Sequence, residues 1–405
     1  MQLLVPALAE RGYRIRMVLP DQGSEPAPVD GLPEGAELET VTVGYPGAPR
    51  LAAWLLRRPA LLGTLVRWYW RALVSKPRLA ASELAMTACL IRSGELVLRG
   101  ERPAIIHAFD TPWSYGSAAA LLARRTGGRS MLSFFGDVLP HEGELDHFDS
   151  VSPPFTGVSR TALENVDLAA SMTQHCRCLV RHVGFDPDRV ALVRVVGSMS
   201  RYHPGVDGSS IRSRHLPGDE GELILYVGHI RPRKGPQVLL EALPEIFKAR
   251  PGARAVFVGP DYGQQAELDA RAAELGVAAS VDFAGAVPDD DLPAYYTAAD
   301  VFVFPTLTTI ECLGLTFVQA MFAETPVVAT RIAGAPEVIR DGVDGLLVEP
   351  SDPVALAARV VELLAMSEET RRALGREGRR RAAELFDEDA VLADLFGAYD
   401  RLLAS

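Results

Sequence analysis

The chain has 405 residues, and its 41 Lys and Arg residues against 52 Asp and Glu residues give a formal net charge of −11. This length suggests two or three domains, each able to bury its own core, and the acidic balance argues against general nucleic-acid binding. No apolar run approaches the length that a membrane-spanning helix needs.

The cysteines and the N-terminus favour a reducing cytoplasm. Cys89, Cys176, Cys178 and Cys312 lack the spacing of metal ligands, so we expect no metal site from them. Residues 1–10 are apolar at helical spacing and predict an amphipathic helix instead of a signal peptide. We therefore expect a cytoplasmic protein.

The first half of the chain predicts strands alternating with helices. After the helix at 1–10, Gly12 acts as a cap and a strand runs from Tyr13 to Leu19. An edge strand is expected near 38–43, and 51–100 is expected to be mostly helical. Further strands are predicted at 104–108, 129–134, 155–159 and 190–196, with helices at 114–126 and 163–170.

The beginning of this half departs from a Rossmann pattern. A Rossmann half normally starts with a strand and a glycine-rich turn before its first helix. Both are missing before the helix at 1–10. Either the true start lies upstream of Met1, or the protein works without the turn.

Within the helical region, the stretch 54–74 mixes arginines with Trp54, Trp68, Tyr69 and Trp70. Basic residues beside aromatic ones can mark a helix that lies on an anionic membrane. The same pattern is typical of an inserted helical pair with an aromatic core face. Peripheral membrane contact and a buried helical pair are both consistent with the sequence.

The polar segment 205–221 predicts a linker, and alternating strands and helices resume after it. Asp289, Asp290 and Asp291 look like the Asp-x-Asp metal motif of some transferases. Carboxylates also favour a helix N-terminus, so we expect them to cap a helix at 292–299 and predict no metal. Strands are expected at 223–227, 255–259, 281–285, 301–304 and 327–329, and helices at 236–249, 315–324, 352–366, 368–385 and 387–403.

The loop after the first of these strands, Gly228 to Gly235, collects positive charge. It contains His229, Arg231, Arg233 and Lys234 directly before a helix. Backbone N–H groups and the helix dipole favour an anion there, and Lys or Arg neutralises it. The loop therefore predicts a diphosphate site.

A second site signal follows the strand at 301–304. The polar loop from Thr306 to Glu311 ends in a carboxylate, and Gly314 then opens a helix. The first N–H groups of a helix have no partner within it. A carboxylate and a helix N-terminus at one strand end predict a ligand site in an open α/β sheet.

These residues resemble the signature of glycosyltransferase family 4, the retaining nucleotide-sugar transferases of GT-B architecture. Three positions depart from that signature: Gln319 stands where the family has a second Glu, His229 replaces an arginine, and Phe135 replaces a histidine. The matching residues are Lys234-Gly235, Glu311, Leu313-Gly314-Leu315, Pro326-Val327-Val328-Ala329, Gly334-Ala335-Pro336-Glu337, Asp341-Gly342 and Gly345-Leu346.

The resemblance implies an α/β fold with two doubly wound, Rossmann-like domains facing across a cleft. The acceptor-side domain would comprise 1–204, with its first strand and glycine-rich turn missing. A linker at 205–221 would precede a nucleotide-sugar-binding domain at 222–385. A helix at 386–405 would cross back to the first domain.

The resemblance further implies the transfer of a sugar from a nucleoside diphosphate sugar to a hydroxyl or amine, with retained anomeric configuration and without a metal or other cofactor. Bacterial polysaccharide, glycolipid or natural-product synthesis would be the setting, and the acceptor stays unidentified. The implied catalytic residues are Glu311, Lys234 and His107. The implied donor-binding residues are Gly228, His229, Arg233, Lys234, Gly285, Val287, Glu311, Leu313, Gly314, Leu315 and Gln319.

The departures leave a second hypothesis open. A glutamine at position 319 keeps one acceptor oxygen for ribose but adds donors, so a deoxyribose donor is also conceivable. Together with His229, Phe135 and the missing glycine-rich turn, Gln319 raises the alternative of a catalytically silent homologue that assists another transferase.

Overall fold

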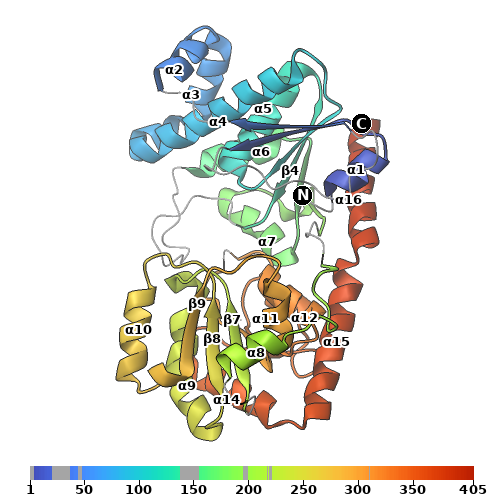
Figure 1. Ribbon diagram of the computed structural model, residues 1–405. Coiled ribbons are helices and arrows are strands. Elements are labelled where there is room, and N and C mark those ends of the chain that lie inside the picture. The colour runs from blue at the N-terminus through green and yellow to red at the C-terminus, as the bar shows by residue number, and fades with distance from the viewer. Residues whose placement is uncertain are drawn as a thin grey trace. The chain divides into compact units, whose positions relative to one another are not determined.

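The computed structural model describes residues 4–20, 37–43, 48–136, 155–194, 199–216, 218, 221–309 and 311–405. The chain divides into two compact units. Unit 1 comprises Met1–Glu142, Val151–Ser198 and Glu388–Ser405, and unit 2 comprises Gly143–Ser150 and Met199–Asp387. Each unit is an α/β structure around a parallel sheet (Figure 1).

Unit 2 contains a six-stranded sheet in the order β12-β11-β10-β7-β8-β9, in which all neighbours are parallel. Every residue of the central strands β7 and β10 is buried, as continuous apolar runs in a parallel sheet require. The strands are β7 (Leu223–Val227), β8 (Arg254–Val258), β9 (Val281–Gly285), β10 (Val301–Phe304), β11 (Val327–Thr330) and β12 (Leu346–Val348).

Helices connect the strands of unit 2 and cover the sheet. Asp352 accepts a hydrogen bond from the Ala355 N–H at 2.9 Å and so caps α14. The helices are α8 (Ser209–His215), α9 (Pro236–Ala249), α10 (Gln265–Glu274), α11 (Leu292–Ala298), α12 (Leu315–Phe322), α13 (Ala335–Val338), α14 (Pro353–Ala365) and α15 (Glu368–Phe386).

Unit 1 contains a four-stranded parallel sheet in the order β3-β4-β5-β6 and a separate parallel pair β1-β2. The strands are β1 (Ile15–Pro20), β2 (Leu38–Val43), β3 (Ile105–Phe109), β4 (Arg129–Phe134), β5 (Leu168–Ser171) and β6 (Val190–Leu192). The helices are α1 (Leu4–Glu10), α2 (Ala48–Leu56), α3 (Pro59–Ser75), α4 (Pro77–Leu98), α5 (Ser117–Thr126), α6 (Thr156–Asn165), α7 (Gln174–Cys178) and α16 (Glu388–Ala404).

The C-terminal helix α16 returns to unit 1, as expected. Its buried residues Leu395 and Tyr399 share a core cluster with Met131 of β4 and Ala170 of β5. Leu4 of α1 joins the same cluster, and α1 lies beside α16 in Figure 1. Both ends of the chain therefore contribute to the core of unit 1.

One strand prediction in unit 1 is wrong. The segment 155–159 was expected as a strand, but residues 156–159 lie in α6, and β5 (Leu168–Ser171) overlaps the end of the segment 163–170 that was expected as a helix. Val158, Ala162 and Leu163 are buried at helical spacing, so the apolar residues follow a period of 3.6.

Two expectations in unit 2 also need correction. The segment 205–221 was expected as a linker, yet it contains α8, whose Arg212 forms an ion pair with Asp300 at 2.8 Å. Asp291 occupies the N-cap position of α11, but its side chain accepts no capping hydrogen bond. A helix that starts with Pro293 at its second position already lacks one of the N–H groups that a cap would bind.

Within the described ranges, no helix is long and apolar enough to cross a membrane.

Candidate active site

The strand order of unit 2 reverses between β7 and β10. From β7 the chain proceeds outward through β8 and β9, and from β10 it proceeds in the other direction through β11 and β12. The carboxyl ends of two such strands form the usual ligand crevice of an open α/β sheet. The loops 228–235 and 305–314, which the sequence singles out, follow these two strands.

Backbone contacts hold the two loops together. The Leu307 N–H donates to the Arg233 carbonyl at 2.9 Å, and the Thr306 hydroxyl donates to the same oxygen at 3.3 Å. Gly235 has a φ of +74°, and a Cβ atom there would lie 1.9 Å from the Pro305 carbonyl oxygen. Only glycine allows this approach.

Lys234 and Glu311 form an ion pair across the two loops. Their side chains are 21% and 19% exposed, so both remain within reach of a ligand while being partly shielded from water. Partial burial strengthens the interaction of each group with an opposite charge. The structure thus brings together a predicted cation and a predicted carboxylate that are 77 residues apart in the chain.

The loop after β7 has a positive electrostatic field. Burial lowers the pKa of His229, and the charges of Lys234, Arg231 and Arg233 lower it further. The Tyr226 hydroxyl donates to the His229 carbonyl at 2.9 Å and thereby fixes the start of the loop. His229 is therefore neutral near pH 7, and the field around it favours an anion.

The N-terminus of α12 faces the same strand end. Gly314 precedes it with a φ of +78°, and no side chain caps the helix. A Cβ atom at Gly314 would lie 2.6 Å from Phe304 and 2.9 Å from Phe317. Leu313 is buried and Leu315 is 39% exposed, so the first turn begins at the surface of the unit. The Phe317 N–H donates to the Gly314 carbonyl at 3.1 Å, so the N–H groups before it are the ones that an acceptor could bind.

Gln319 lies one turn further along α12. Its Oε1 accepts a hydrogen bond of 2.9 Å from the hydroxyl of Tyr296, a completely buried residue of α11. A glutamine has only one side-chain acceptor oxygen. Because Tyr296 uses this oxygen, the remaining capacity of Gln319 lies mostly in its amide N–H donors.

The ends of β7, β8 and β9 are joined through backbone atoms. The Gly228 N–H donates to the Val258 carbonyl at 2.9 Å, and the Gly259 N–H donates to the Gly285 carbonyl at 2.8 Å. Gly285 has a φ of +69°, and Val287 follows it as a half-buried residue. The predicted donor-binding residues Gly285 and Val287 therefore lie on the β8-β9 side of the same sheet edge.

His107 lies in unit 1, in β3, and is half-buried. Its Nδ1 is 2.7 Å from the Tyr399 hydroxyl and its Nε2 is 2.8 Å from the Ser133 hydroxyl. Burial lowers the pKa of His107 to about 3. Both ring nitrogens are thus used within unit 1, and this geometry supports a structural role instead of the predicted catalytic one. Phe135 stacks on Phe109 at the ends of β4 and β3.

Sequence reasoning did not single out the turn after β3. Asp110 has a φ of +114°, a conformation that is strained for any residue except glycine and is often found at functional sites. A π-helical turn, Pro112–Gly116, follows it. Burial raises the pKa of Glu83, although the Trp113 Nε1–H donates to its carboxylate at 3.1 Å. The residue types alone carry no signal of this strain.

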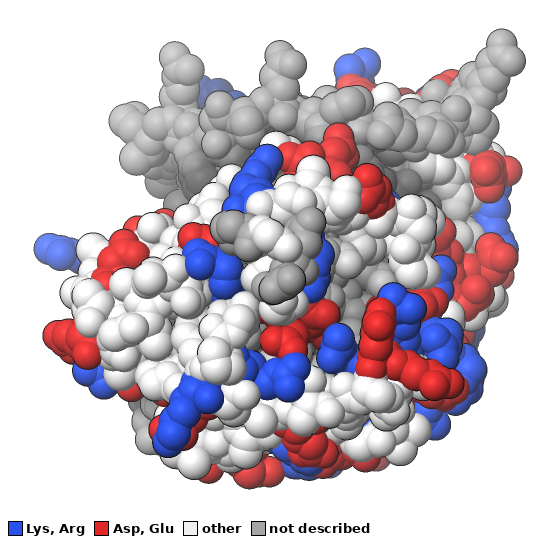
Figure 2. Space-filling view, turned by 60° about the horizontal axis from the view of Figure 1, so that its bottom comes forward, with Lys and Arg blue, Asp and Glu red and all other residues white. Residues whose placement is uncertain are grey.

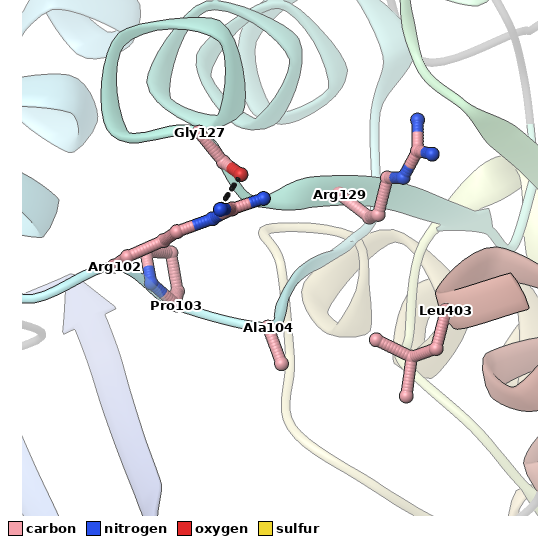
Figure 3. A pocket seen from close by; sticks show the side chains of 6 residues that line it. All are labelled: Arg102, Pro103, Ala104, Gly127, Arg129 and Leu403. Atoms are coloured by element: carbon pink, nitrogen blue, oxygen red, sulfur yellow. Dashed lines mark hydrogen bonds between the residues drawn. The ribbon is translucent and has the colours of Figure 1, made fainter. Parts of the chain in front are cut away.

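A cavity of about 330 Å³ in unit 1 lies away from these strand ends (Figure 3). Ala104 precedes β3 and Arg129 begins β4, so the cavity opens at the amino edge of the sheet. The Arg102 Nε–H donates to the Gly127 carbonyl at 2.7 Å. The lining residues are Arg102, Pro103, Ala104, Gly127, Arg129 and Leu403.

Comparison with known proteins covers nearly the whole chain. The sequence profile of the glycosyl transferase 4-like domain matches residues 1–195, and that of glycosyl transferases group 1 matches residues 208–381. A D-inositol 3-phosphate glycosyltransferase of Frankia alni (strain DSM 45986 / CECT 9034 / ACN14a) is 30% identical over 343 residues, which are 76% of this chain and 84% of that protein.

The chain belongs to glycosyltransferase family 4. The family member of Corynebacterium glutamicum (strain R), also a D-inositol 3-phosphate glycosyltransferase, is 33% identical over 251 residues, or 60% of this chain and 59% of that protein. Across four such relatives the matched region spans between 45% and 59% of their length.

The predicted GT-B fold class is confirmed by similarity to solved structures. The crystal structure of Anabaena Alr3699/HepE in complex with UDP and glucose superposes with a TM-score of 0.70 at 17% identity. The superposition covers 99% of this chain and 95% of that one. The superposition therefore includes both Rossmann-like units.

Proposed function

We propose that this family 4 protein transfers a sugar from a nucleoside diphosphate sugar to a hydroxyl or amine of an acceptor. The observation that carries the proposal is the meeting of Lys234 and Glu311 at the reversal point of the unit 2 sheet, beside the uncapped N-terminus of α12. The UDP bound to HepE supports a nucleotide donor. The bacterial relatives support a role in bacterial polysaccharide, glycolipid or natural-product synthesis.

The difficult step of such a transfer is the departure of a nucleoside diphosphate. Negative charge develops on the diphosphate as the glycosidic bond breaks, and preorganised positive groups stabilise it. Lys234 and the first N–H groups of α12 are such groups, and Arg233 adds charge. These cations supply the stabilisation in our proposal, and the reaction proceeds without a metal or other cofactor.

Glu311 has a different task in this proposal. Its carboxylate holds a hydroxyl of the donor sugar and faces the positive charge that builds up at the anomeric carbon. The acceptor attacks from the side of the departing diphosphate, so the anomeric configuration is retained. An NMR assignment of the product anomer tests this, because inversion of the donor configuration would contradict it.

The donor specificity depends on Gln319. Its acceptor oxygen is bonded to Tyr296, so a ribose would meet mainly N–H donors. We propose that ribose binds here with fewer hydrogen bonds than a glutamate would supply and that a deoxyribose is also accepted. Gly228, His229, Gly285, Val287, Leu313, Gly314 and Leu315 complete the proposed donor site.

The direct test is ligand-induced thermal stabilisation with UDP-, GDP-, ADP- and dTDP-sugars. One donor is expected to raise the melting temperature of the wild type, and Lys234→Ala is expected to weaken its binding at least about tenfold, because a charge-assisted contact is lost. Lys248→Ala removes an exposed lysine of α9 and serves as the matched control. Stabilisation by none of the four donors would argue against a transferase.

A catalytically silent homologue is the second candidate. The engagement of the Gln319 oxygen by Tyr296 favours it, because a weakened ribose contact would be tolerated in a protein that no longer turns over donor. Transfer that requires a second protein, together with intact function of Lys234→Ala, would support this candidate.

We further propose a cytoplasmic location. Cys89, Cys176, Cys178 and Cys312 all lie in described segments and form no disulfide, as is usual in a reducing compartment. Contact of the stretch 54–74 with a membrane surface is part of this proposal.

A further inference from the structure

The charge of the chain is unevenly distributed along the sequence. Between Glu39 and Glu83 there is no Asp or Glu, although the whole chain has 52 of them. The same interval carries Arg50, Arg57, Arg58, Arg67, Arg71, Lys76 and Arg78. An acidic protein therefore contains a wholly basic segment, and α2 and α3 form most of it.

Helix α3 is anchored in unit 1 by one face. Leu61, Leu65, Tyr69 and Ala72 are buried at helical spacing, and the Tyr69 hydroxyl donates to the Trp113 carbonyl in the turn after β3. Leu61 and Leu65 pack in a cluster with residues of α4 and α5. The rotation of α3 about its axis is thus fixed, and its opposite face points to solvent.

The outward face of α3 combines cations with large apolar side chains. Trp70 is 61% exposed and Val74 is 65% exposed, and Arg67 and Arg71 are exposed beside them. Arg67 and Arg71 lie four positions apart, as do Trp70 and Val74, and these two neighbouring pairs form one stripe, which we call the α3 stripe. Leu56, at the end of α2, is 71% exposed as well.

The two cations of the stripe have no carboxylate partner on the described surface. Arg67 and Arg71 form no ion pair with any residue in the described ranges. On the face that Figure 2 shows, in contrast, blue and red side chains lie interspersed. Exposed cations without an ion pair attract an anionic partner, and an exposed tryptophan beside them suits a partner that also receives an aromatic ring.

We propose that the α3 stripe is the part of the stretch 54–74 that docks on a membrane and that it selects an anionic phospholipid surface, an inference that rests on the membrane contact proposed above. Tryptophan is enriched at the boundary between headgroups and acyl chains, where its ring is buried and its N–H stays hydrated. Arginines flanking it bind the headgroup phosphates and are attracted by the negative surface potential. The stripe offers both features on a fixed helix, with no carboxylate to repel the surface.

The proposal is tested by sedimentation of the full-length protein with phosphatidylcholine vesicles that do or do not contain phosphatidylglycerol. Binding is expected only to the vesicles with phosphatidylglycerol and is expected to weaken with added salt. Arg67→Glu/Arg71→Glu should reduce the affinity about 25-fold or more, since each basic residue near such a surface contributes about a fivefold increase in affinity.

Arg372→Glu/Arg376→Glu is the matched control. These exposed arginines lie four positions apart on α15, so the double variant changes the net charge equally. It is expected to bind vesicles within about twofold of the wild type. If both double variants lost the same affinity for the vesicles, the net charge of the protein alone would explain binding, and the assignment to α3 would be overturned. Unchanged binding of Arg67→Glu/Arg71→Glu would overturn it as well.

Trp70 provides an independent readout. Brominated lipids are expected to quench tryptophan fluorescence in the bound protein, and this quenching should be clearly smaller in Trp70→Phe than in Trp113→Phe, since Trp113 is buried, while both variants still bind. Absence of vesicle binding by the wild type would overturn the proposal and direct attention to an acidic protein partner. Donor-induced stabilisation depends on residues of unit 2, so its outcome is distinguishable from that of the vesicle assay.

Discussion

At the scale of single residues, the candidate site depends on one close approach of two backbones. Gly235 lies at a φ of +74°, and a Cβ atom there would lie 1.9 Å from the Pro305 carbonyl oxygen. The loops that carry Lys234 and Glu311 meet at this point. The position of both charged groups therefore depends on the absence of a side chain.

We expect Gly235→Ala to separate the two loops and to abolish donor-induced stabilisation, with a loss of stability of at least about 3 kcal/mol. Gly276→Ala is the control, because Gly276 has a φ of +71° and nothing within 4 Å of the added Cβ. This control should lose only about 1 kcal/mol of stability, which is the cost of a left-handed backbone conformation for a residue with a Cβ atom. Equal effects of the two substitutions in thermal unfolding would contradict the contact argument.

Residue types predicted some site members better than others. Lys234, Glu311 and Gly314 occur where strand ends and helix starts could be read from the sequence, and the structure brings them to one sheet edge. The roles assigned to them stay predictions. The partner of Gln319 could not be predicted, because Tyr296 comes from a different helix and only packing brings the two together.

At the scale of elements, hydrogen bonds of His107 connect β3 to β4 and to α16. Its ring bonds to Ser133 of β4 and Tyr399 of α16, and it stacks on Phe109 at 3.9 Å. Protonation would put a positive charge on a ring that is shielded from water and whose two nitrogens already have hydroxyl partners. The attachment of α16 should therefore weaken in acid.

The direction of this effect follows from linkage. The pKa of His107 is about 3 in the folded chain and 6.5 when the side chain is free, so between these values the unfolded chain binds the proton and the folded chain does not. This part of the stability is complete above pH 6.5 and is lost as the pH falls toward 3. From pH 7 to pH 5 the free energy of unfolding should decrease by about 2 kcal/mol on this account.

His107→Gln removes the titrating group. Its unfolding free energy should depend less on pH than that of the wild type, by about 2 kcal/mol between pH 7 and pH 5. Tryptophan fluorescence during urea denaturation measures this, since Trp54, Trp68, Trp70 and Trp113 all belong to unit 1. The same pH dependence in both proteins would show that protonation of the His107 ring does not lower the free energy of unfolding.

The bounds of strands with a strong apolar pattern were predicted closely, whereas those of strands with a weak apolar pattern were not. The strands at 129–134 and 301–304 were expected with the bounds that the structure gives. β5 reads Leu-Ala-Ala-Ser, a short run of small residues with little β-propensity, and the apolar residues before it fit a helix equally well. Its place is decided by pairing with β4 and β6.

At the scale of the whole molecule, the order of the chain does not follow the division into units. α16 is the last element, yet its Leu395 lies in the core of unit 1 together with Met131 and Val193. Sequence resemblance predicted this return, but composition and periodicity could not, because an amphipathic helix does not specify which sheet it covers.

Because α16 packs in the core of unit 1, we expect it to stabilise that unit. Leu395 is fully buried and Leu403, on the same helix, is 46% exposed. Leu395→Ala should cost about 3 kcal/mol by leaving a cavity, whereas Leu403→Ala should cost about 0.5 kcal/mol or less. The tryptophan-detected urea transition should shift to lower urea in the first variant alone.

Hydrogen exchange distinguishes a local effect from a global one. In Leu395→Ala, amides of β3 and β4 should lose protection, while those of β7 and β10 should keep theirs, because α16 contributes no residue to the described core of unit 2. Loss of protection in both sheets together would mean that the two units unfold as one. In that case the C-terminal helix would stabilise the donor site of unit 2 as well, and substitutions in it would also reduce donor-induced stabilisation.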